Sequence, residues 1–239
     1  MIVAIDAGNT RIKWGVSDGA RWIAQGALPT AKSAHIAEIS KEWSPDAQIV
    51  GCNVAGEAVE ATIDAWLAPG LAPIRWLHSS AGVCGVRNSY DQPDSLGADR
   101  WSALIGARSM TVANCLVVCA GTATTVDWLD ADGVFRGGLI LPGFELMRTS
   151  LAQNTVLLPL ADGQVSAEPH NTRDAIVSGC LNAQVGAIER MFSRMASDPD
   201  ARCLITGGAA KCLVPHLSIP YTLVENLIFE GLVGFAASQ

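Results

Sequence analysis

The stretch AIDAGNTRIKWG, residues 4–15, joins an apolar segment to a turn of small polar residues and then to an alternating segment. A strand that is apolar on both faces is typical of the centre of a sheet, so residues 2–7 predict a central strand. Gly8-Asn9 and Asp18-Gly19 tolerate positive φ and predict tight turns. The chain is therefore expected to open with three antiparallel strands.

Asp6 places a carboxylate at the tip of this buried strand. An unpaired buried carboxylate is costly, and that cost is relieved if Asp6 faces a magnesium ion, directly or through water. The alternative is that the side chain caps its own turn. Both interpretations remain open at this point.

The opening pattern restarts at NCLVVCAGTATTVDWLDADGVFRGGLILPG, residues 114–143. An apolar strand again runs into Gly and Thr, a hairpin is expected at Asp132-Gly133, and a further strand ends at Pro142-Gly143. Helices and strands alternate elsewhere, with a helix expected over residues 34–43. The sequence thus predicts two similar lobes, residues 1–110 and residues 111–239.

Three glycine turns, each after an apolar strand, could face a nucleotide: residues 6–10, 120–125 and 206–211. Glycine lets backbone N–H groups approach phosphate oxygens, and flanking Thr and Asn side chains add donors. Neither a P-loop nor a dinucleotide-binding glycine motif occurs, so hairpins would have to hold the phosphates. Each turn alone is equally typical of a simple chain reversal.

The motif LGADRW, residues 96–101, places Asp99 and Arg100 at the entry of a helix. Asp99 is a candidate general base and Arg100 a candidate clamp for a carboxylate or phosphate, with Tyr90 just upstream. The alternative is that Asp99 only caps the helix. Thr172 could likewise cap the helix that follows it.

Composition limits the classes of function. With 49% hydrophobic residues, a formal charge of −7 and a pI near 5.0, the chain predicts a compact protein that binds neither nucleic acid nor an anionic membrane. No leader-like segment and no apolar run of about 18 residues occurs, so a cytoplasmic protein is expected. The seven cysteines and four histidines show no metal-ligand spacing.

Taken together and in this order, DAGNTRIKWG, GADRW, GTATTVD and GGLILPG closely resemble type III pantothenate kinases. That family is similar to the acetate kinase, sugar kinase, Hsp70 and actin superfamily. The resemblance implies an α/β fold of two ribonuclease-H-like lobes with a nucleotide cleft between them. It also implies ATP-dependent phosphorylation of pantothenate to 4'-phosphopantothenate, the first step of coenzyme A synthesis.

The resemblance also implies roles for individual residues. Asp99 would be the catalytic base, Asp6 would lie at the magnesium ion, and the protein would be a homodimer with its pantothenate pocket close to the subunit interface. The implied ATP contacts are Asp6, Ala7, Gly8, Asn9, Thr10, Arg11, Ile12, Lys13 and Thr122, and the implied pantothenate contacts are Tyr90, Gly97, Ala98, Asp99, Arg100 and Thr172.

Cys119 departs from the family pattern. Many relatives have an aspartate here that binds a monovalent cation, potassium or ammonium, beside the second phosphate loop. A neutral thiol is a poor ligand for such hard ions. The sequence therefore predicts a weakened cation dependence, with neighbouring oxygens such as the Asp127 carboxylate, or a backbone carbonyl of the subunit partner, as substitute ligands.

Two other classes of function remain open. The first is a regulatory or transcription accessory protein that keeps this fold; the presence of Asp6, Asp99 and Arg100 argues against it, and the acidic composition argues against direct DNA contact. The second is another small-molecule kinase or ATPase of the same superfamily, which the fold alone does not exclude.

Overall fold

The computed structural model describes residues 1–155, 158, 160 and 162–238, and these cluster into two compact units. The first unit comprises Met1–Thr111 and the segment from Asn226 to the end of the described chain. The second comprises Val112–Glu225. The division expected from the sequence placed residues 111–239 in one lobe, and it differs from the observed one because the last helix packs within the first unit.

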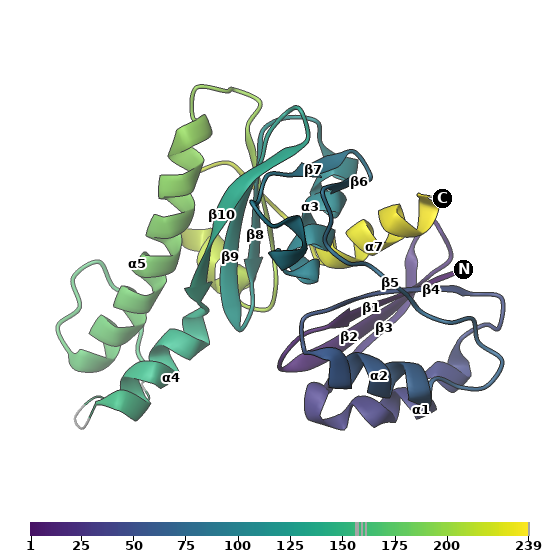
Figure 1. Ribbon diagram of the computed structural model, residues 1–239. Coiled ribbons are helices and arrows are strands. Elements are labelled where there is room, and N and C mark those ends of the chain that lie inside the picture. The colour runs from purple at the N-terminus through teal and green to yellow at the C-terminus, as the bar shows by residue number, and fades with distance from the viewer. Residues whose placement is uncertain (156–157, 159, 161, 239) are drawn as a thin grey trace. The chain divides into compact units, whose positions relative to one another are not determined.

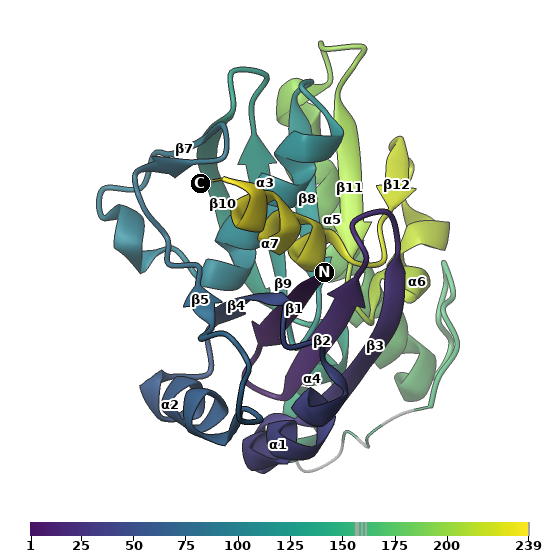
Figure 2. The same cartoon turned by 90° about the vertical axis from the view of Figure 1, so that its right-hand side faces the viewer.

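A five-stranded sheet forms the centre of the first unit, with the order β3-β2-β1-β4-β5 (Figure 2). Strand β1 is the central strand, as its apolar faces predict; it pairs with β2 in the antiparallel and with β4 in the parallel direction. The strands are β1 (Ile2–Ala7), β2 (Arg11–Ser17), β3 (Trp22–Pro29), β4 (Gln48–Asn53) and β5 (Arg75–Trp76).

Helices cover both faces of this sheet (Figure 1). On one face Val3, Ile5 and Ala7 pack in a core that Ile36 of α1 and Ile63 of α2 complete. Because side chains alternate along a strand, Ala4 and Asp6 lie on the opposite face, where α7 packs against β1 and β4. The helices are α1 (Ile36–Ile39), α2 (Glu57–Trp66), α3 (Ala98–Met110) and α7 (Leu227–Ala237).

The segment expected to be helical, residues 34–43, is helical up to Glu42, but it is not one continuous α-helix. Two 3₁₀ turns, Thr30–His35 and Ser40–Glu42, flank the single turn of α1. The Ser40 hydroxyl accepts a hydrogen bond from the Ala68 amide at 3.0 Å. The α-helical part of this segment is therefore a single turn, and the Ser40 hydroxyl ties its end to the backbone that follows α2.

The second unit repeats the strand order of the first. Within its sheet the strands follow β10-β9-β8-β11-β12, with β8 antiparallel to β9 and parallel to β11. These are β8 (Cys115–Ala120), β9 (Ala123–Leu129), β10 (Val134–Pro142), β11 (Arg202–Thr206) and β12 (Tyr221–Leu223). The restart of the pattern near residue 114 is thus confirmed.

The remaining elements of the second unit are mainly helical. Helix α5 packs over one face of the sheet, where Ile176, Val177 and Ile188 join Leu116 and Val118 in a second core. The helices are α4 (Phe144–Asn154), α5 (Thr172–Phe192) and α6 (Ala210–Leu213), with 3₁₀ turns at Ser193–Met195 and Val214–His216.

In the first unit β6 (Gly82–Val83) and β7 (Val86–Asn88) form a hairpin, and Pro93–Ser95 is a 3₁₀ turn.

Two glycines let α3 and α7 cross at backbone contact. A Cβ atom on Gly106 would overlap the Leu227 carbonyl oxygen, and one on Gly231 would overlap the Ser102 carbonyl oxygen. The Ser102 hydroxyl also donates to the Ile228 carbonyl at 2.7 Å. This crossing explains why the C-terminal helix belongs to the first unit.

We expect Gly231→Ala to lower the free energy of unfolding of the first unit by about 1–3 kcal/mol or more, because its methyl group overlaps backbone that cannot move aside. Gly234→Ala on the same helix is the control, since its Cβ lies at an ordinary 3.4 Å from Ile105. Ala favours a helix over Gly by up to about 1 kcal/mol, so the control should match or exceed wild type. Urea denaturation of wild type and both variants measures these free energies. A Gly231→Ala protein as stable as Gly234→Ala would contradict the close contact between α3 and α7.

Candidate functional site

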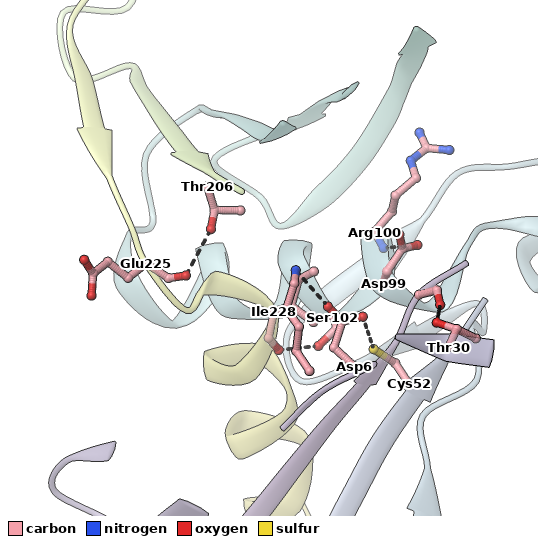
Figure 3. A network of polar contacts seen from close by, with 11 residues as sticks. Asp6, Thr30, Cys52, Asp99, Arg100, Ser102, Thr206, Glu225 and Ile228 are labelled. Carbon is pink, nitrogen blue, oxygen red and sulfur yellow. Dashed lines mark hydrogen bonds and ion pairs between the residues drawn. The ribbon is translucent and has the colours of Figure 1, made fainter. Parts of the chain in front are cut away.

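The first glycine turn is closed by main-chain hydrogen bonds and supported by β3. The Gly8 amide donates to the Arg11 carbonyl at 3.1 Å, which confirms the tight turn between β1 and β2. Thr30 fixes the turn from the side: its hydroxyl donates to the Gly8 carbonyl at 2.6 Å and its amide to the Thr10 carbonyl at 3.1 Å (Figure 3). Asn9, Thr10 and Arg11 remain exposed at its tip.

Asp6 lies between two neighbouring strands at the base of this turn. The strand register places Lys13 of β2 on one side of it and Cys52 of β4 on the other. The Lys13 ammonium is 3.4 Å from Asp6 Oδ2, and the Cys52 thiol is 3.8 Å from Oδ1. These partners, and the main-chain closure of the turn, do not favour the alternative in which Asp6 caps its own turn.

Burial dominates the electrostatics of Asp6. The residue is only 5% exposed, and loss of water raises the pKa of its carboxyl above the ordinary 3.8. The Lys13 ammonium lowers this pKa, while the negative charge of Asp99 raises it. Two carboxylates thus lie within electrostatic reach of each other in the first unit, a combination that attracts a cation.

The start of α3 carries Asp99 and Arg100. Gly97 is the N-cap residue, and its missing side chain leaves room for the Asp99 carboxylate, since a Cβ there would lie 2.7 Å from Asp99 Oδ1. Oδ1 of Asp99 also accepts a hydrogen bond from the Arg100 amide at 2.8 Å. Asp99 is therefore not the N-cap residue; it lies in the first turn of α3, where a negative charge is favourable.

Arg100 and Tyr90 form the pair that the sequence predicted for one pocket. The Arg100 guanidinium donates to the Tyr90 hydroxyl at 3.0 Å and lies 5.7 Å from the centre of its ring. Arg100 is 5% exposed, so its charge is largely removed from water. Figure 3 shows the guanidinium pointing away from the Asp99 carboxylate. A buried guanidinium beside a phenol is suited to bind a carboxylate or phosphate.

In the second unit, three chain reversals meet around Gly121 and Thr122. The Gly121 amide donates to the Ala123 carbonyl at 2.9 Å and confirms the hairpin between β8 and β9. The Gly143 amide, at the start of α4, donates to the Thr122 carbonyl at 2.8 Å. Gly207 adjoins Ala120 so closely that a Cβ there would lie 2.6 Å from the Ala120 carbonyl carbon.

The third glycine turn is not a hairpin, which corrects the expectation that hairpins alone would hold phosphates. Thr206 ends β11, and the chain then turns through Gly207 at φ +101° into α6. The Ala209 amide donates to the Ala120 carbonyl at 3.0 Å, so this turn lies against the second one. Strand-to-helix and strand-to-strand turns thus share one edge of the sheet.

Cys119 pairs with Thr125 across the β8–β9 hairpin. The Thr125 hydroxyl is buried without a hydrogen-bond partner, which is unusual for a native polar group. Asp127, 1% exposed, lies two residues further along the same face of β9. Oxygen atoms of Thr125 and Asp127 therefore lie on the β9 strand that pairs with Cys119.

Thr172 does not cap its helix, because Asn171 does so. Asn171 Oδ1 accepts from the Asp174 amide at 3.0 Å, which makes Thr172 the first helical residue of α5. Thr172 instead lines an apolar groove of about 760 Å³ between α4 and α5. The other residues along this groove are Pro142, Leu146, Met147, Ser150, Leu151, Leu158, Ala175, Ile176, Gly179, Cys180 and Ala183.

Several residues of the site were not predicted from the sequence. The Cys52 thiol contacts the Asp6 carboxylate. Thr30 contacts the first glycine turn, and Gly143 contacts the second. A parallel pairing of β1 with β4 would have indicated Cys52, because the register sets it beside Asp6. No group of three or more His, Cys, Asp or Glu residues in the described chain could hold a metal by itself.

Comparison with known proteins agrees with this architecture. The chain is similar to a Baf-family protein of Campylobacter jejuni described as a transcriptional activator (TM-score 0.62, 20% identity, 97% and 95% of the two chains). It is also similar to a protein of Sinorhizobium meliloti described as a 2-dehydro-3-deoxygalactonokinase (TM-score 0.63, 16% identity, 99% and 98%). At these identities the likeness shows the fold alone, which is an α/β fold of two compact units.

Sequence comparison is more specific. A model of the type III pantothenate kinase family matches residues 2–194. The type III pantothenate kinase of Aromatoleum aromaticum is 58% identical over 233 residues, covering 97% of this chain and 96% of that protein. That of Azoarcus sp. strain BH72 is 50% identical over 241 residues, covering 100% and 92%. The chain belongs to the type III pantothenate kinase family. No helix of the described residues could span a membrane.

We expect Asp6→Asn to raise the melting temperature at pH 7 by about 2–4 °C. This shift corresponds to a gain on the order of 1 kcal/mol in the free energy of unfolding of a protein of this length. The pKa of the Asp6 carboxyl is higher in the folded protein than in the unfolded chain, where it is near 3.8. Its ionisation therefore lowers the free energy of unfolding as the pH rises through the pKa of the folded state, and it has no effect below about pH 3.8. The advantage of the variant should therefore vanish below about pH 4. Melting scans from pH 3 to 8 test this, and a variant less stable at pH 7 would contradict it.

Proposed function

We propose that this protein phosphorylates pantothenate with ATP at the terminal hydroxyl, giving 4'-phosphopantothenate for coenzyme A synthesis. The observation that carries the proposal is the start of α3, where Asp99 and Arg100 are consecutive residues and the Arg100 guanidinium donates to the Tyr90 hydroxyl. The substrate has a carboxylate for the guanidinium and a hydroxyl for the aspartate. The proposal is supported by the names of relatives that are 48–58% identical.

In the proposed reaction each group has a separate task. Arg100 binds the pantothenate carboxylate, Asp99 accepts the proton of the attacking hydroxyl, and backbone amides of the glycine turns bind the ATP phosphates. Phosphoryl transfer is catalysed chiefly by positioning and charge neutralisation, so this small set of residues is sufficient. The further family contacts at Ala7, Ala98 and Thr172 remain part of the proposal.

The residues around Asp6 fit a magnesium ion. Mg²⁺ is commonly bound by one or two carboxylates together with substrate phosphates and water. Asp6 supplies one buried carboxylate at the base of an exposed turn whose Asn9 and Thr10 can meet a phosphate. When bound with ATP, the ion would neutralise phosphate charge; Lys13, half-exposed beside Asp6, would turn toward the phosphates.

One assay tests the function. ADP release is followed in a coupled reaction with ATP and magnesium, with pantothenate present or omitted. We expect release only with pantothenate. ADP release without pantothenate would indicate an ATPase, and no release in either case would contradict kinase activity. Replacing pantothenate by sugars would reveal another small-molecule kinase of the superfamily.

We expect Asp99→Asn to lower kcat about 10²- to 10⁴-fold, because the amide fills the same space but accepts no proton. Binding of ATP should be nearly unchanged in calorimetry. Asp94→Asn, an exposed carboxylate in the preceding 3₁₀ turn, is the matched control. If Asp99→Asn keeps more than about a third of the wild-type rate, Asp99 serves only the helix end and another base must be sought.

We further propose that the dependence on a monovalent cation is weak. Cys119 offers a thiol where relatives have an aspartate, and potassium and ammonium prefer oxygen ligands. The partnerless Thr125 hydroxyl opposite Cys119, and Asp127 on the same face, supply the oxygens for a residual site. Such a site would lack the negative charge at position 119.

Cys119→Asp should introduce a clear activation by potassium or ammonium over sodium, because it restores a charged oxygen ligand. Wild type should respond only weakly. Turnover of both proteins in sodium, potassium and ammonium buffers of equal ionic strength measures this. Steep activation of wild type that stays unaltered in the variant would show that position 119 does not govern the cation.

We also propose a homodimer that uses the face formed by α4 and α5. Leu146 is 45% and Leu151 36% exposed on α4, beside the apolar groove that Thr172 lines. Small residues follow one another on the exposed side of α5: Ala175, Gly179, Ala183 and Gly186. Exposed apolar side chains beside a flat helix surface are suited to close packing with a second helix pair.

Gly179→Arg should turn the dimer into a monomer. Its Cβ meets nothing within 4 Å, so the unit itself accepts the side chain, whereas a charge in an apolar interface should raise the dimer Kd by at least about 100-fold. Ala61→Arg on the exposed side of α2 is the control. Light scattering after size exclusion measures the mass; a variant that stays dimeric would place the interface elsewhere.

A further inference from the structure

Cys52 is a wholly buried neighbour of the Asp6 carboxylate. It lies on β4, directly opposite Asp6 of β1 in the parallel register, and is 0% exposed. Its thiol is 3.8 Å from Asp6 Oδ1, within the range of a hydrogen bond from sulfur (Figure 3). The proposed reaction assigns no role to this residue.

The two oxygens of Asp6 have different neighbours. Oδ1 accepts from the buried Cys52 thiol, while Oδ2 faces the Lys13 ammonium, whose side chain is 50% exposed. A thiol can act as a hydrogen-bond donor, so Cys52 can donate to Oδ1. One oxygen thus has a buried partner, and the other has a half-exposed one.

We propose that Cys52 is a positioning residue for Asp6: its thiol fixes Oδ1 so that Oδ2 is presented to the cation that accompanies the nucleotide phosphates. The inference deepens the proposed function and rests on it. Rotation about the last bond of an aspartate side chain is broad and nearly two-fold, so a donor on one oxygen is needed to select one orientation. Groups that orient a metal ligand in this way commonly change metal affinity 10- to 100-fold when removed.

The opposing explanation is that Cys52 only fills space in the sheet, as buried free cysteines often do. Two substitutions separate the explanations. Cys52→Ala removes the donor and some volume, whereas Cys52→Ser removes similar packing but keeps a donor. Cys203→Ala is the packing control, since Cys203 is equally buried, at 0% exposure, in β11 of the second unit.

The experiment measures binding rather than turnover. Calorimetry gives the affinity of each full-length variant for the non-hydrolysable analogue AMP-PNP, with Mg²⁺ and with excess chelator. For Cys52→Ala we expect about tenfold weaker binding of the magnesium complex and unchanged metal-free binding, with Cys52→Ser within about threefold of wild type and Cys203→Ala unchanged. Melting temperatures measured in parallel report the loss of packing.

Three outcomes would overturn the inference: a Cys52→Ala affinity for the magnesium complex equal to wild type, equal losses in Cys52→Ala and Cys52→Ser, or equal losses with and without magnesium. Asp6→Ala separates this failure from failure of the site itself. If Asp6→Ala abolishes the magnesium effect while Cys52→Ala does not, only the role of Cys52 is lost. If Asp6→Ala also has no effect, the magnesium site proposed at Asp6 is lost as well.

Discussion

The backbone contact between α3 and α7 is the constraint on which the first unit depends. Glycines at 106 and 231 let the two helices approach until no Cβ atom fits between them. Helix α7 in turn packs against β1 and β4, on the face of the sheet that carries Asp6. The crossing therefore holds the start of α3, with Asp99 and Arg100, in a fixed relation to the end of β1. Two glycines thus fix the position of Asp99 relative to Asp6, although the two residues lie far apart in the sequence.

The buried carboxylate of Asp6 lowers the stability of the same unit at neutral pH. Its carboxyl is buried, its pKa is raised by loss of water, and a second carboxylate adds repulsion. A partly exposed lysine offsets this cost incompletely. Such arrangements are typical of positions where a charged ligand completes the electrostatics, since unpaired buried charge is otherwise avoided.

The sequence was sufficient for the antiparallel strands at the first two glycine turns and for the repeated pattern, because these depend on local alternation and on turn residues. It also indicated Tyr90, Asp99 and Arg100, which lie close together along the chain. Cys52 and Thr30 could not be predicted, since they reach the site only through strand pairing. The helix expected over residues 34–43 forms as one α-helical turn between two 3₁₀ turns.

The discontinuity of the first unit has a consequence for synthesis. The second unit is contiguous, Val112–Glu225, and all of it leaves the ribosome before α7 does. Domains fold as units during translation, so the part encoded in the middle of the gene can complete its core first. The part encoded at the start must wait, with the α7-facing side of its sheet uncovered, until α7 emerges. The N-terminal segment therefore exposes apolar surface on the nascent chain for longer than the second unit does.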